Sequence, residues 1–375
     1  MERMQEKSIR LDLDRKYVFI TGPRQVGKTT LARNVARAWK GSAYLNFDAD
    51  RDRPVILRQS WDRKAPLVIL DEVHKLKRWK RRLKGVYDTE GIPPRILVTG
   101  SARLDLYRRG GDSMAGRYFL HRLHPFSVRE LRGSDAPRGI LDRLILLGGF
   151  PEPYLSGSES ESARWRLQHL ERIVREDIQD LEPVRDVRSL LLLVDLLRER
   201  VGSPVSYASL GRDLELSPHT VKRWIEVLDH MYVLFLVRPW HRNVARGILK
   251  APKVYFYDTG AVAGGEGVRL ENAVAVCLRK WLHFLADTRG RSKDLFYIRD
   301  KEKREVDFAV VEKQRPRMLI EVKRSDTAVS RALAHFSARL KPDEALQLVQ
   351  TASRPETAGS IHVRPAADWL DSLDA

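Results

Sequence analysis

The stretch YVFITGPRQVGKTTL, residues 17–31, joins an apolar run to a glycine-rich loop and then to a helical pattern. Gly22, Gly27, Lys28 and Thr29 occupy the fixed positions of the pattern G-x-x-x-x-G-K-[ST]. Glycines let backbone N–H groups converge on phosphate oxygens, and the N-terminus of the following helix adds a favourable dipole. Lys28 can neutralise the β- and γ-phosphates of ATP, and the Thr29 hydroxyl can ligate Mg²⁺. The stretch therefore predicts a nucleotide-binding loop between a strand and a helix.

A second apolar run, LVILDEVH at residues 67–74, ends in two acids and is typical of a strand covered on both faces. Asp71 at its tip is expected to hold the hydration shell of Mg²⁺, with Thr29 as the other metal-site residue. Glu72 is the candidate general base that deprotonates the attacking water. An ordinary strand that ends in a solvated acidic pair is the alternative. The residues predicted to contact ATP and Mg²⁺ are Gly22, Pro23, Arg24, Gln25, Val26, Gly27, Lys28, Thr29, Thr30 and Asp71.

A third apolar run, RILVTGS at residues 95–101, ends in small hydroxyl residues. Thr99 or Ser101 could contact the γ-phosphate or the water, and we favour Ser101; a plain turn is the alternative. A polar stretch then leads to Arg117, just before another strand at residues 118–123. In ring-forming ATPases an arginine at this place reaches the γ-phosphate of the neighbouring subunit. Arg117 is thus a candidate arginine finger, against a simple surface arginine.

The chain is strongly basic, with 68 Lys and Arg against 50 Asp and Glu among 375 residues and a formal charge of +18. This excess favours a polyanionic partner, most simply DNA; a generally charged surface is the alternative. A basic run follows the acidic strand tip directly and could track a phosphate backbone. Its members are Lys75, Lys77, Arg78, Lys80, Arg81, Arg82 and Lys84, of which Lys80 and Arg81 are our candidates for DNA contact.

Composition also bounds the compartment and the size of the core. At 43% hydrophobic residues the chain can bury a sizeable core, and its length suggests two to four domains. No apolar run is long enough to span a bilayer, and residues 1–17 lack the pattern of a signal peptide. Cys277 is the sole cysteine, which excludes an intrachain disulfide. We expect a cytoplasmic protein with no membrane partner.

The spacing from residue 205 onward predicts two short helices followed by two strands. Helices are expected at residues 207–214 and 220–230, with Ser217 in the turn between them. Strands are expected at residues 232–237 and 253–257 across a basic hairpin. This order is typical of a winged helix-turn-helix, which can bind DNA or proteins. The candidate DNA contacts are His219, Lys222, Arg223 and Arg242.

The last third of the chain carries a separate set of chemical groups. A helix is predicted at residues 271–285, and strands at residues 306–311 and 318–323. Because side chains alternate along a strand, Glu321 and Lys323 share a face, which Asp307 on the next strand can join. Carboxylates that ligate Mg²⁺ beside a lysine form a plausible phosphodiester-cleaving site. The pattern resembles the PD-(D/E)XK nuclease fold with Glu271 as an extra helix acid; a silent structural domain is the alternative.

Ten ordered motifs, from GPRQVGKTTL to IEVK, together resemble one family of bacterial and archaeal AAA-type P-loop ATPases. The other motifs are LDEVHK, VTGS, AGR, HPFS, GGFPE, KVYFYDTG, LENAV and EVDF. This family carries a C-terminal domain of unknown function with a restriction-endonuclease-like fold. The resemblance implies an α/β fold with an AAA-type core at residues 1–132, a helical lid at 133–182, a winged helix-turn-helix at 183–250 and a nuclease-like domain at 251–375.

Three functions are compatible with these observations. The leading hypothesis is a DNA-acting ATPase motor, a ring-shaped homo-oligomer and most simply a hexamer, that translocates on or remodels duplex or branched DNA. Four-way junctions are a substrate suggested by analogy alone. An ATP-regulated DNA nuclease is the second hypothesis, and a nucleotide-switched scaffold or regulator is the third. Stimulation of ATP hydrolysis by DNA would separate the first from the others.

Overall fold

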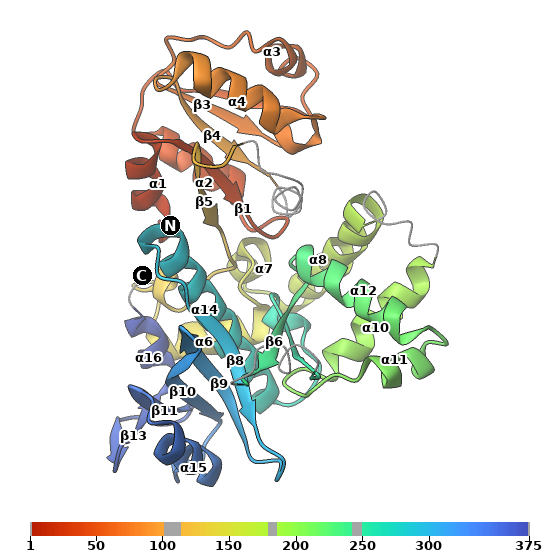
Figure 1. Ribbon diagram of the computed structural model, residues 1–375, viewed down its shortest axis with the longest axis vertical. Helices are drawn as coiled ribbons and strands as arrows, with labels where there is room; N and C mark the ends of the chain where they lie inside the picture. The colour runs from red at the N-terminus through yellow and green to blue at the C-terminus, as the bar shows by residue number, and fades with distance from the viewer. Residues whose placement is uncertain (1, 101–113, 179–185, 242–249, 374–375) are drawn as a thin grey trace. The chain divides into compact units, whose positions relative to one another are not determined.

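A computed structural model describes residues 2–100, 114–178, 186–241 and 250–373 of the chain (Figure 1). The chain divides into two compact units, and each is described by itself. The first comprises residues 1–124 with 287–290, and the second comprises residues 125–286 with 291–375. The first unit therefore ends close to the boundary that the sequence predicts after residue 132.

The first unit is built on a parallel sheet of five described strands in the order β2-β3-β4-β1-β5. The strands are β1 (Tyr17–Thr21), β2 (Ala43–Asn46), β3 (Leu67–Asp71), β4 (Arg95–Thr99) and β5 (Tyr118–Arg122). Every residue of β1 and β3 is buried, as their apolar runs predict. Thr99 lies beside Ile20 on one side and Asp71 on the other. The carboxyl ends of three strands thus meet at one edge.

Helices cover this sheet because each carries an apolar stripe. They are α1 (Glu6–Leu13), α2 (Lys28–Ala36), α3 (Arg53–Arg58) and α4 (Trp79–Glu90). Trp79, Leu83 and Val86 of α4 are buried and share one core cluster with Phe19 and Leu70 of the strands. The helices α1 and α2 instead contact each other and β4. The core of the first unit therefore lies between its sheet and its helices.

The second unit begins with helices. Its described helices are α6 (Pro137–Leu147), α7 (Pro151–Ser156), α8 (Glu159–Arg172), α10 (Val187–Arg198), α11 (Tyr207–Asp213), α12 (Pro218–His230), α14 (Glu266–Arg289, whose last residues belong to the first unit), α15 (Arg331–Leu340) and α16 (Ala366–Ser372). The helix α8 begins at Glu159 because Ser158 accepts the N–H of Glu161, and a π-helical turn at residues 173–178 continues it. The helix α14 starts at Glu266, so the prediction that Glu271 opens this helix is wrong.

The helices α11 and α12 form at the residues that the sequence predicts. Ser217 caps α12 by accepting the N–H of Thr220. The buried residues of α12 recur at helical spacing and turn one face to the core, which leaves the other face to solvent. They are Val221, Trp224, Ile225 and Leu228. One side of α12 is therefore available for contact with a partner.

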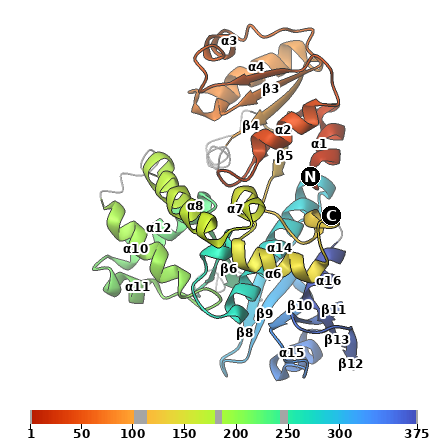
Figure 2. The same cartoon turned by 180° about the vertical axis from the view of Figure 1, so that it is seen from behind.

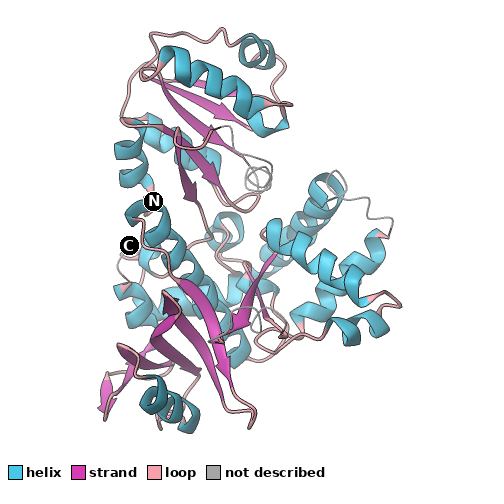
Figure 3. Cartoon of the chain, viewed as in Figure 1, coloured by secondary structure: helices cyan, strands magenta, loops and turns pink. Residues whose placement is uncertain are grey.

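A second sheet has eight described strands in the order β12-β13-β11-β10-β9-β8-β6-β7 (Figure 3). The strands are β6 (Leu234–Pro239), β7 (Lys253–Phe256), β8 (Asp294–Arg299), β9 (Glu305–Glu312), β10 (Arg315–Lys323), β11 (Glu344–Val349), β12 (Glu356–Ala358) and β13 (Ile361–Pro365). The strands β6 and β7 pair in antiparallel fashion, and β6 also pairs with β8. The boundary predicted after residue 250 therefore lies between two paired strands of one sheet.

The helix α15 contacts β9, β10 and β11 of this sheet (Figure 2). Leu333 and Phe336 of α15 are buried in one cluster with Leu319 of β10 and Ala345 of β11. Cys277 is buried in α14, as its apolar surroundings predict. Among the described residues, no helix has the length and apolar character needed to cross a membrane.

Candidate functional site

The loop at residues 22–27 has the backbone shape of a phosphate cradle. Gly22 has a φ of 146°, and a Cβ there would overlap the carbonyl oxygen of Leu123. Gly27 has a φ of 96° and directly precedes the first turn of α2. Only glycine adopts both conformations at low cost. The glycine spacing in the sequence therefore reflects a backbone that must pass close to a neighbouring strand and then enter a helix.

Lys28 lies on the first turn of α2 and folds back over this loop. Its side chain is buried, and its Nζ donates to the carbonyl oxygens of Gly22 at 3.1 Å and Pro23 at 2.6 Å. The two carbonyl oxygens hold the ammonium of Lys28 at the loop, beside the first turn of α2. This places Lys28 where a bound phosphate would meet it.

Asp71 ends β3 and is held by three hydroxyl groups. Thr29 donates to its Oδ2 at 2.8 Å and Tyr44 donates to the same oxygen at 2.6 Å. Thr99 donates to Oδ1. A carboxylate next to a threonine hydroxyl is an all-oxygen donor pair, which is the ligand type that Mg²⁺ prefers. The chemistry of the donor pair therefore fits Mg²⁺, as the sequence predicts for Thr29 and Asp71.

Sequence reasoning missed Tyr44 and preferred Ser101 to Thr99. Tyr44 lies on β2, and the guanidinium of Arg33 stacks 4.5 Å from the centre of its ring. The Thr99 hydroxyl is bonded to Asp71, while Ser101 lies outside the described residues. The only signal for Tyr44 was its place near the end of a short apolar run.

Glu72 follows Asp71 in a left-handed conformation, with a φ of 58°, and its N–H donates to the carbonyl of Thr99 at 3.0 Å. Its carboxylate lies 3.6 Å from Lys75 Nζ and 3.7 Å from His74 Nε2. Burial raises the pKa of Glu72, and the positive charges of Lys28 and Lys75 oppose this shift. A carboxylate with a raised pKa close to the phosphate loop has the properties of a general base.

Arg117 precedes β5 and is engaged within its own chain. Its Nε lies 2.6 Å from Asp88 Oδ1 on α4, and the same carboxylate accepts a second bond from Nη2 at 3.2 Å. The side chain of Arg117 remains 28% exposed. Residues 101–113, which include the predicted helix before Arg117, lie outside the described residues. An action of Arg117 on a neighbouring subunit would require it to leave Asp88.

The predicted DNA contacts differ in their exposure to solvent. Arg81, His219, Lys222 and Arg223 are exposed, whereas Lys80 is half-buried with its Nζ 5.7 Å from the centre of the Trp79 ring. Lys222 also lies 4.0 Å from Glu226 on the same helix. Lys75, at the start of the basic run, lies 2.5 Å from Asp48. Arg242 lies outside the described residues.

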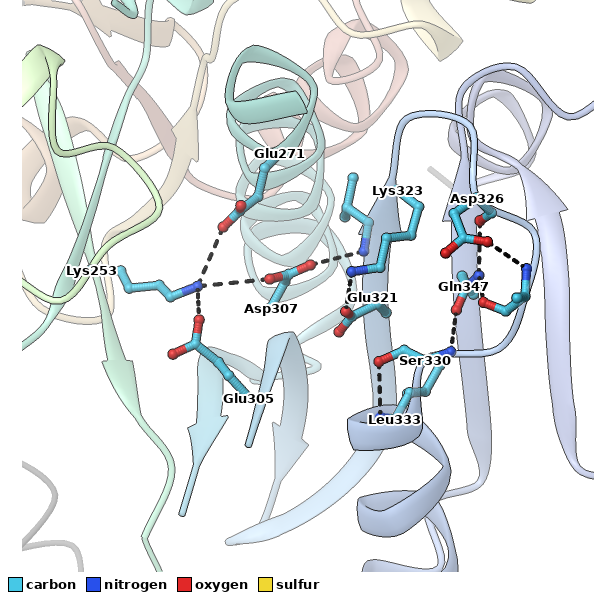
Figure 4. Close-up of polar contacts among 12 residues, drawn as sticks. Lys253, Glu271, Glu305, Asp307, Glu321, Lys323, Asp326, Ser330, Leu333 and Gln347 are labelled. Atoms are coloured by element: carbon cyan, nitrogen blue, oxygen red, sulfur yellow. Dashed lines mark hydrogen bonds and ion pairs between the residues drawn. The ribbon is translucent and has the colours of Figure 1, made fainter. Parts of the chain in front are cut away.

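The four C-terminal candidates come together as the sequence predicts (Figure 4). Asp307 of β9 accepts the N–H of Val322 at 2.9 Å, which fixes this carboxylate against β10. Lys323 Nζ lies 2.8 Å from Glu321 Oε1 on the same strand. In this view Glu271 of α14 lies above and to the left of Asp307, whereas Glu321 and Lys323 lie to its right. One helix and two strands thus supply a group of carboxylates, of which Glu321 is buried and Glu271 and Asp307 are partly buried.

Three residues of this cluster were missed by sequence reasoning: Lys253 and Tyr255 of β7, and Glu305 of β9. Lys253 Nζ lies 2.7 Å from Glu305 Oε1, and Tyr255 donates to Glu271 Oε1 at 2.6 Å. No spacing rule within one segment connects β7 to α14 or β9. The apolar run around residues 253–257 predicted the strand but not its chemistry.

The carboxylates of the cluster have perturbed acidities. Burial, reinforced by the charge of Asp307, raises the pKa of Glu271 to about 7 and that of Glu321 to about 7. Burial also raises the pKa of Asp307. In the described part of the chain, no group of three or more acidic, histidine or cysteine side chains has the arrangement that holds a metal ion. Because Tyr255 and Lys253 engage Glu271 and the N–H of Val322 engages Asp307, the residues present do not fit a metal held jointly by Glu271, Asp307 and Glu321.

Comparison with known families matches three consecutive stretches of the chain. Residues 14–132 match the AAA domain. Residues 138–268 match a domain of unknown function (DUF8612), and residues 266–369 match another (DUF4143). The first match covers the phosphate loop and the acidic strand tip, and the other two cover the second unit.

Individual proteins are similar over most of the chain. The uncharacterized protein Rv2008c of Mycobacterium tuberculosis is 29% identical over 329 residues, covering 84% of this chain and 72% of that protein. A Walker-type ATPase of Pyrococcus abyssi has 18% identity and a TM-score of 0.40, covering 72% of this chain and 95% of that one. The RuvB Holliday junction branch migration motor of Thermotoga maritima has 18% identity and a TM-score of 0.34, covering 62% and 89%.

The family match and the geometry of the loop agree on the first part of the chain. Its phosphate loop, its buried lysine and its acidic strand tip lie within the matched residues 14–132. The chain therefore carries an AAA-type P-loop ATPase domain at residues 14–132, followed by two domains of unknown function.

Proposed function

We propose that this chain is a Mg²⁺-dependent ATP hydrolase that couples hydrolysis to movement on, or remodelling of, duplex or branched DNA. The observation that carries the hydrolytic part is the contact between the Thr29 hydroxyl and the Asp71 carboxylate at 2.8 Å. It joins the start of α2 to the tip of β3, so one site offers both groups to a cation beside the phosphate loop. Mg²⁺ bound there would neutralise phosphate charge.

The residues of this site have distinct roles in the proposed reaction. Lys28 and the loop N–H groups bind and orient the β- and γ-phosphates. Glu72 orients a water molecule and accepts its proton as the water oxygen bonds to the γ-phosphorus. The bond between the γ-phosphorus and the bridging oxygen breaks, and ADP leaves with that electron pair. The left-handed backbone at Glu72 turns its carboxylate away from the buried strand, toward Lys75 and His74.

The DNA part of the proposal rests on α11, α12 and the β6–β7 pair, which follow one another in the order of a winged helix-turn-helix. The exposed residues His219, Lys222 and Arg223 lie on α12, the helix that would enter a groove of DNA. The formal charge of +18 supports a polyanionic partner. We assign the phosphate contacts to these side chains and to Lys80 and Arg81.

A ring-shaped homo-oligomer, most simply a hexamer, completes the proposed motor. In it, Arg117 would leave Asp88 and reach the γ-phosphate bound by the neighbouring subunit. The ion pair with Asp88 is partly exposed, and such pairs contribute little stability. Arg117 can therefore leave the carboxylate of Asp88 for a phosphate with little loss of stability.

Hydrolysis measured on different nucleic acids tests the proposal directly. The assay compares ATP turnover without DNA and with duplex, single-stranded and four-way-junction DNA, with the oligomeric state recorded for each. We expect DNA to stimulate turnover and the active species to be an oligomer. Turnover that no DNA changes would favour a nucleotide-switched scaffold instead.

The second unit is proposed to be nuclease-like in fold but to cleave DNA weakly or not at all. We rank nuclease activity below ATP hydrolysis because Tyr255 donates to Glu271 and Lys253 forms an ion pair with it. Digestion of linear and branched DNA with Mg²⁺ or Mn²⁺ checks it in the wild type and in Lys323→Ala. Robust cleavage that the variant loses would make the nuclease the primary function.

A further inference from the structure

Lys253 is the most deeply buried cation of the C-terminal cluster. It lies on β7 with a relative exposure of 1%. Its Nζ lies 2.7 Å from Glu305 Oε1, 3.4 Å from Glu271 Oε1 and 3.8 Å from Asp307 Oδ1 (Figure 4). A buried ammonium is strongly disfavoured unless carboxylates surround it. Three carboxylates from one helix and one strand thus converge on a single nitrogen.

The oxygens around Lys253 are also occupied by other donors. Tyr255 donates to the same oxygen of Glu271 that faces Lys253. Arg299 Nη1 lies 3.1 Å from the second oxygen of Glu305. The N–H of Val322 donates to the second oxygen of Asp307. Mg²⁺ and Mn²⁺ require oxygen ligands on several sides, whereas here each carboxylate already has an ammonium and one further donor.

We infer that Lys253 is the resident cation of this cluster and takes the place that a divalent metal would need between Glu271, Glu305 and Asp307. The ion pairs of Lys253 then hold β7 against α14 and β9, and the cluster does not act as a metal centre. Desolvation lowers the pKa of Lys253, but the three carboxylates more than offset this, so its pKa is raised and the side chain stays charged.

These ion pairs join two segments of the chain that match different domain families. Lys253 and Tyr255 lie in residues 138–268, and the three carboxylates lie in residues 266–369. The strand β7 is at the edge of its sheet and pairs with β6 alone among the described strands. The ion pairs to α14 and β9 therefore add to the hydrogen bonds that Asn272 of α14 makes with the backbone of Phe256 in this strand. This role is independent of whether the chain acts on DNA.

Removing the ammonium should create a metal site. The measurement counts Mn²⁺ bound to the full-length, nucleotide-free chain by electron paramagnetic resonance. All variants carry Asp71→Asn, so the first unit contributes no ion. We expect the protein with Lys253 to bind no Mn²⁺ and Lys253→Met to bind about one Mn²⁺ per chain. Lys253→Arg keeps the charge and is the matched control, which should stay metal-free.

Two further variants keep the inference falsifiable. Glu271→Gln added to Lys253→Met should abolish the gained Mn²⁺, because it removes one of the carboxylates. If Lys253→Met unfolds, Lys253→Gln replaces it, because its amide removes the charge and can still donate to the carboxylates, and its thermal midpoint should rise with Mn²⁺. The inference is overturned by Mn²⁺ binding with Lys253 intact that Asp307→Asn abolishes. It is equally overturned if a folded Lys253→Met or Lys253→Gln variant gains no Mn²⁺.

Discussion

Asp71 in the first unit and Asp307 in the second are both strand carboxylates, yet their surroundings differ in charge. Asp71 accepts from the hydroxyls of Thr29, Tyr44 and Thr99, which orient it without cancelling its charge. Asp307 faces the ammonium of Lys253 and a backbone N–H. Neutral donors leave a carboxylate able to bind an added cation, whereas an internal ammonium supplies that cation permanently. Two similar acids can therefore have opposite metal affinities.

The largest expected effect tests the acid next to Asp71. Glu72→Gln should bind ATP but lose turnover on the order of 100-fold or more, because an amide cannot accept the proton of water. Lys28→Ala should instead weaken ATP binding itself. Steady-state hydrolysis and equilibrium nucleotide binding separate the two variants. Wild-type turnover in Glu72→Gln would remove this residue as the base.

The next effect concerns Arg117, whose present partner is Asp88. Arg117→Ala should retain ATP binding and lose hydrolysis on the order of 100-fold or more, as expected for an arginine that stabilises the transition state. Mixing Arg117→Ala with Glu72→Gln should restore part of the activity, since some interfaces then hold both groups. Asp88→Ala is the control, because it breaks the ion pair and leaves Arg117 in place. A fully active monomer would contradict the assignment.

The next effect is on DNA affinity, which we attribute to exposed surface charges and not to the two carboxylate sites. Lys222→Glu with Arg223→Glu should lower DNA affinity about tenfold or more and leave turnover without DNA unchanged. The slope of log K against log salt should fall in magnitude by about 2, since each phosphate contact contributes about 0.9. Lys301→Glu reverses an exposed charge elsewhere and is the matched control. Equal losses in both variants would point to non-specific attraction.

A smaller effect sharpens the comparison at Asp71 itself. Tyr44→Phe and Thr99→Val each remove one hydroxyl that donates to Asp71, and such a hydrogen bond is worth about 1 kcal/mol. Each variant should therefore raise the Mg²⁺ concentration needed for half-maximal turnover about five- to tenfold. The two variants remove donors to different oxygens of the same carboxylate. Turnover measured against Mg²⁺ concentration is the readout. Unchanged Mg²⁺ dependence in both would mean that these hydroxyls do not orient Asp71.

The last effect concerns stability and not turnover or binding, and it is a pH dependence in the second unit. Burial and the charge of Asp307 raise the pKa of Glu321 from its ordinary value near 4.5 to about 7. A group whose pKa is higher in the folded than in the unfolded chain stabilises the folded state. This contribution is fully present below the pKa of the unfolded chain and is lost as the pH rises through about 7. The free energy of unfolding should therefore decline between pH 4.5 and pH 7, and less so in Glu321→Gln. Identical declines in urea titrations of both proteins would contradict this.

The phosphate loop was predictable from sequence because its chemistry is written into one continuous segment, from Gly22 to Thr29. Glu321 and Lys323 were predictable for the same reason, since alternation along one strand fixes their common face. Lys253 and Tyr44 were not, because their partners lie on other strands and helices that only the fold brings near. The start of α14 was also missed, because the glycines at positions 264, 265 and 267 disfavour a helix locally.

The contrast between the two carboxylate sites is tested most directly by the number of Mn²⁺ ions that wild-type protein binds with a non-hydrolysable ATP analogue. We predict one ion per chain, which Asp71→Asn abolishes and Asp307→Asn leaves in place. A second ion that disappears in Asp307→Asn would contradict the account, as would a single ion that survives Asp71→Asn.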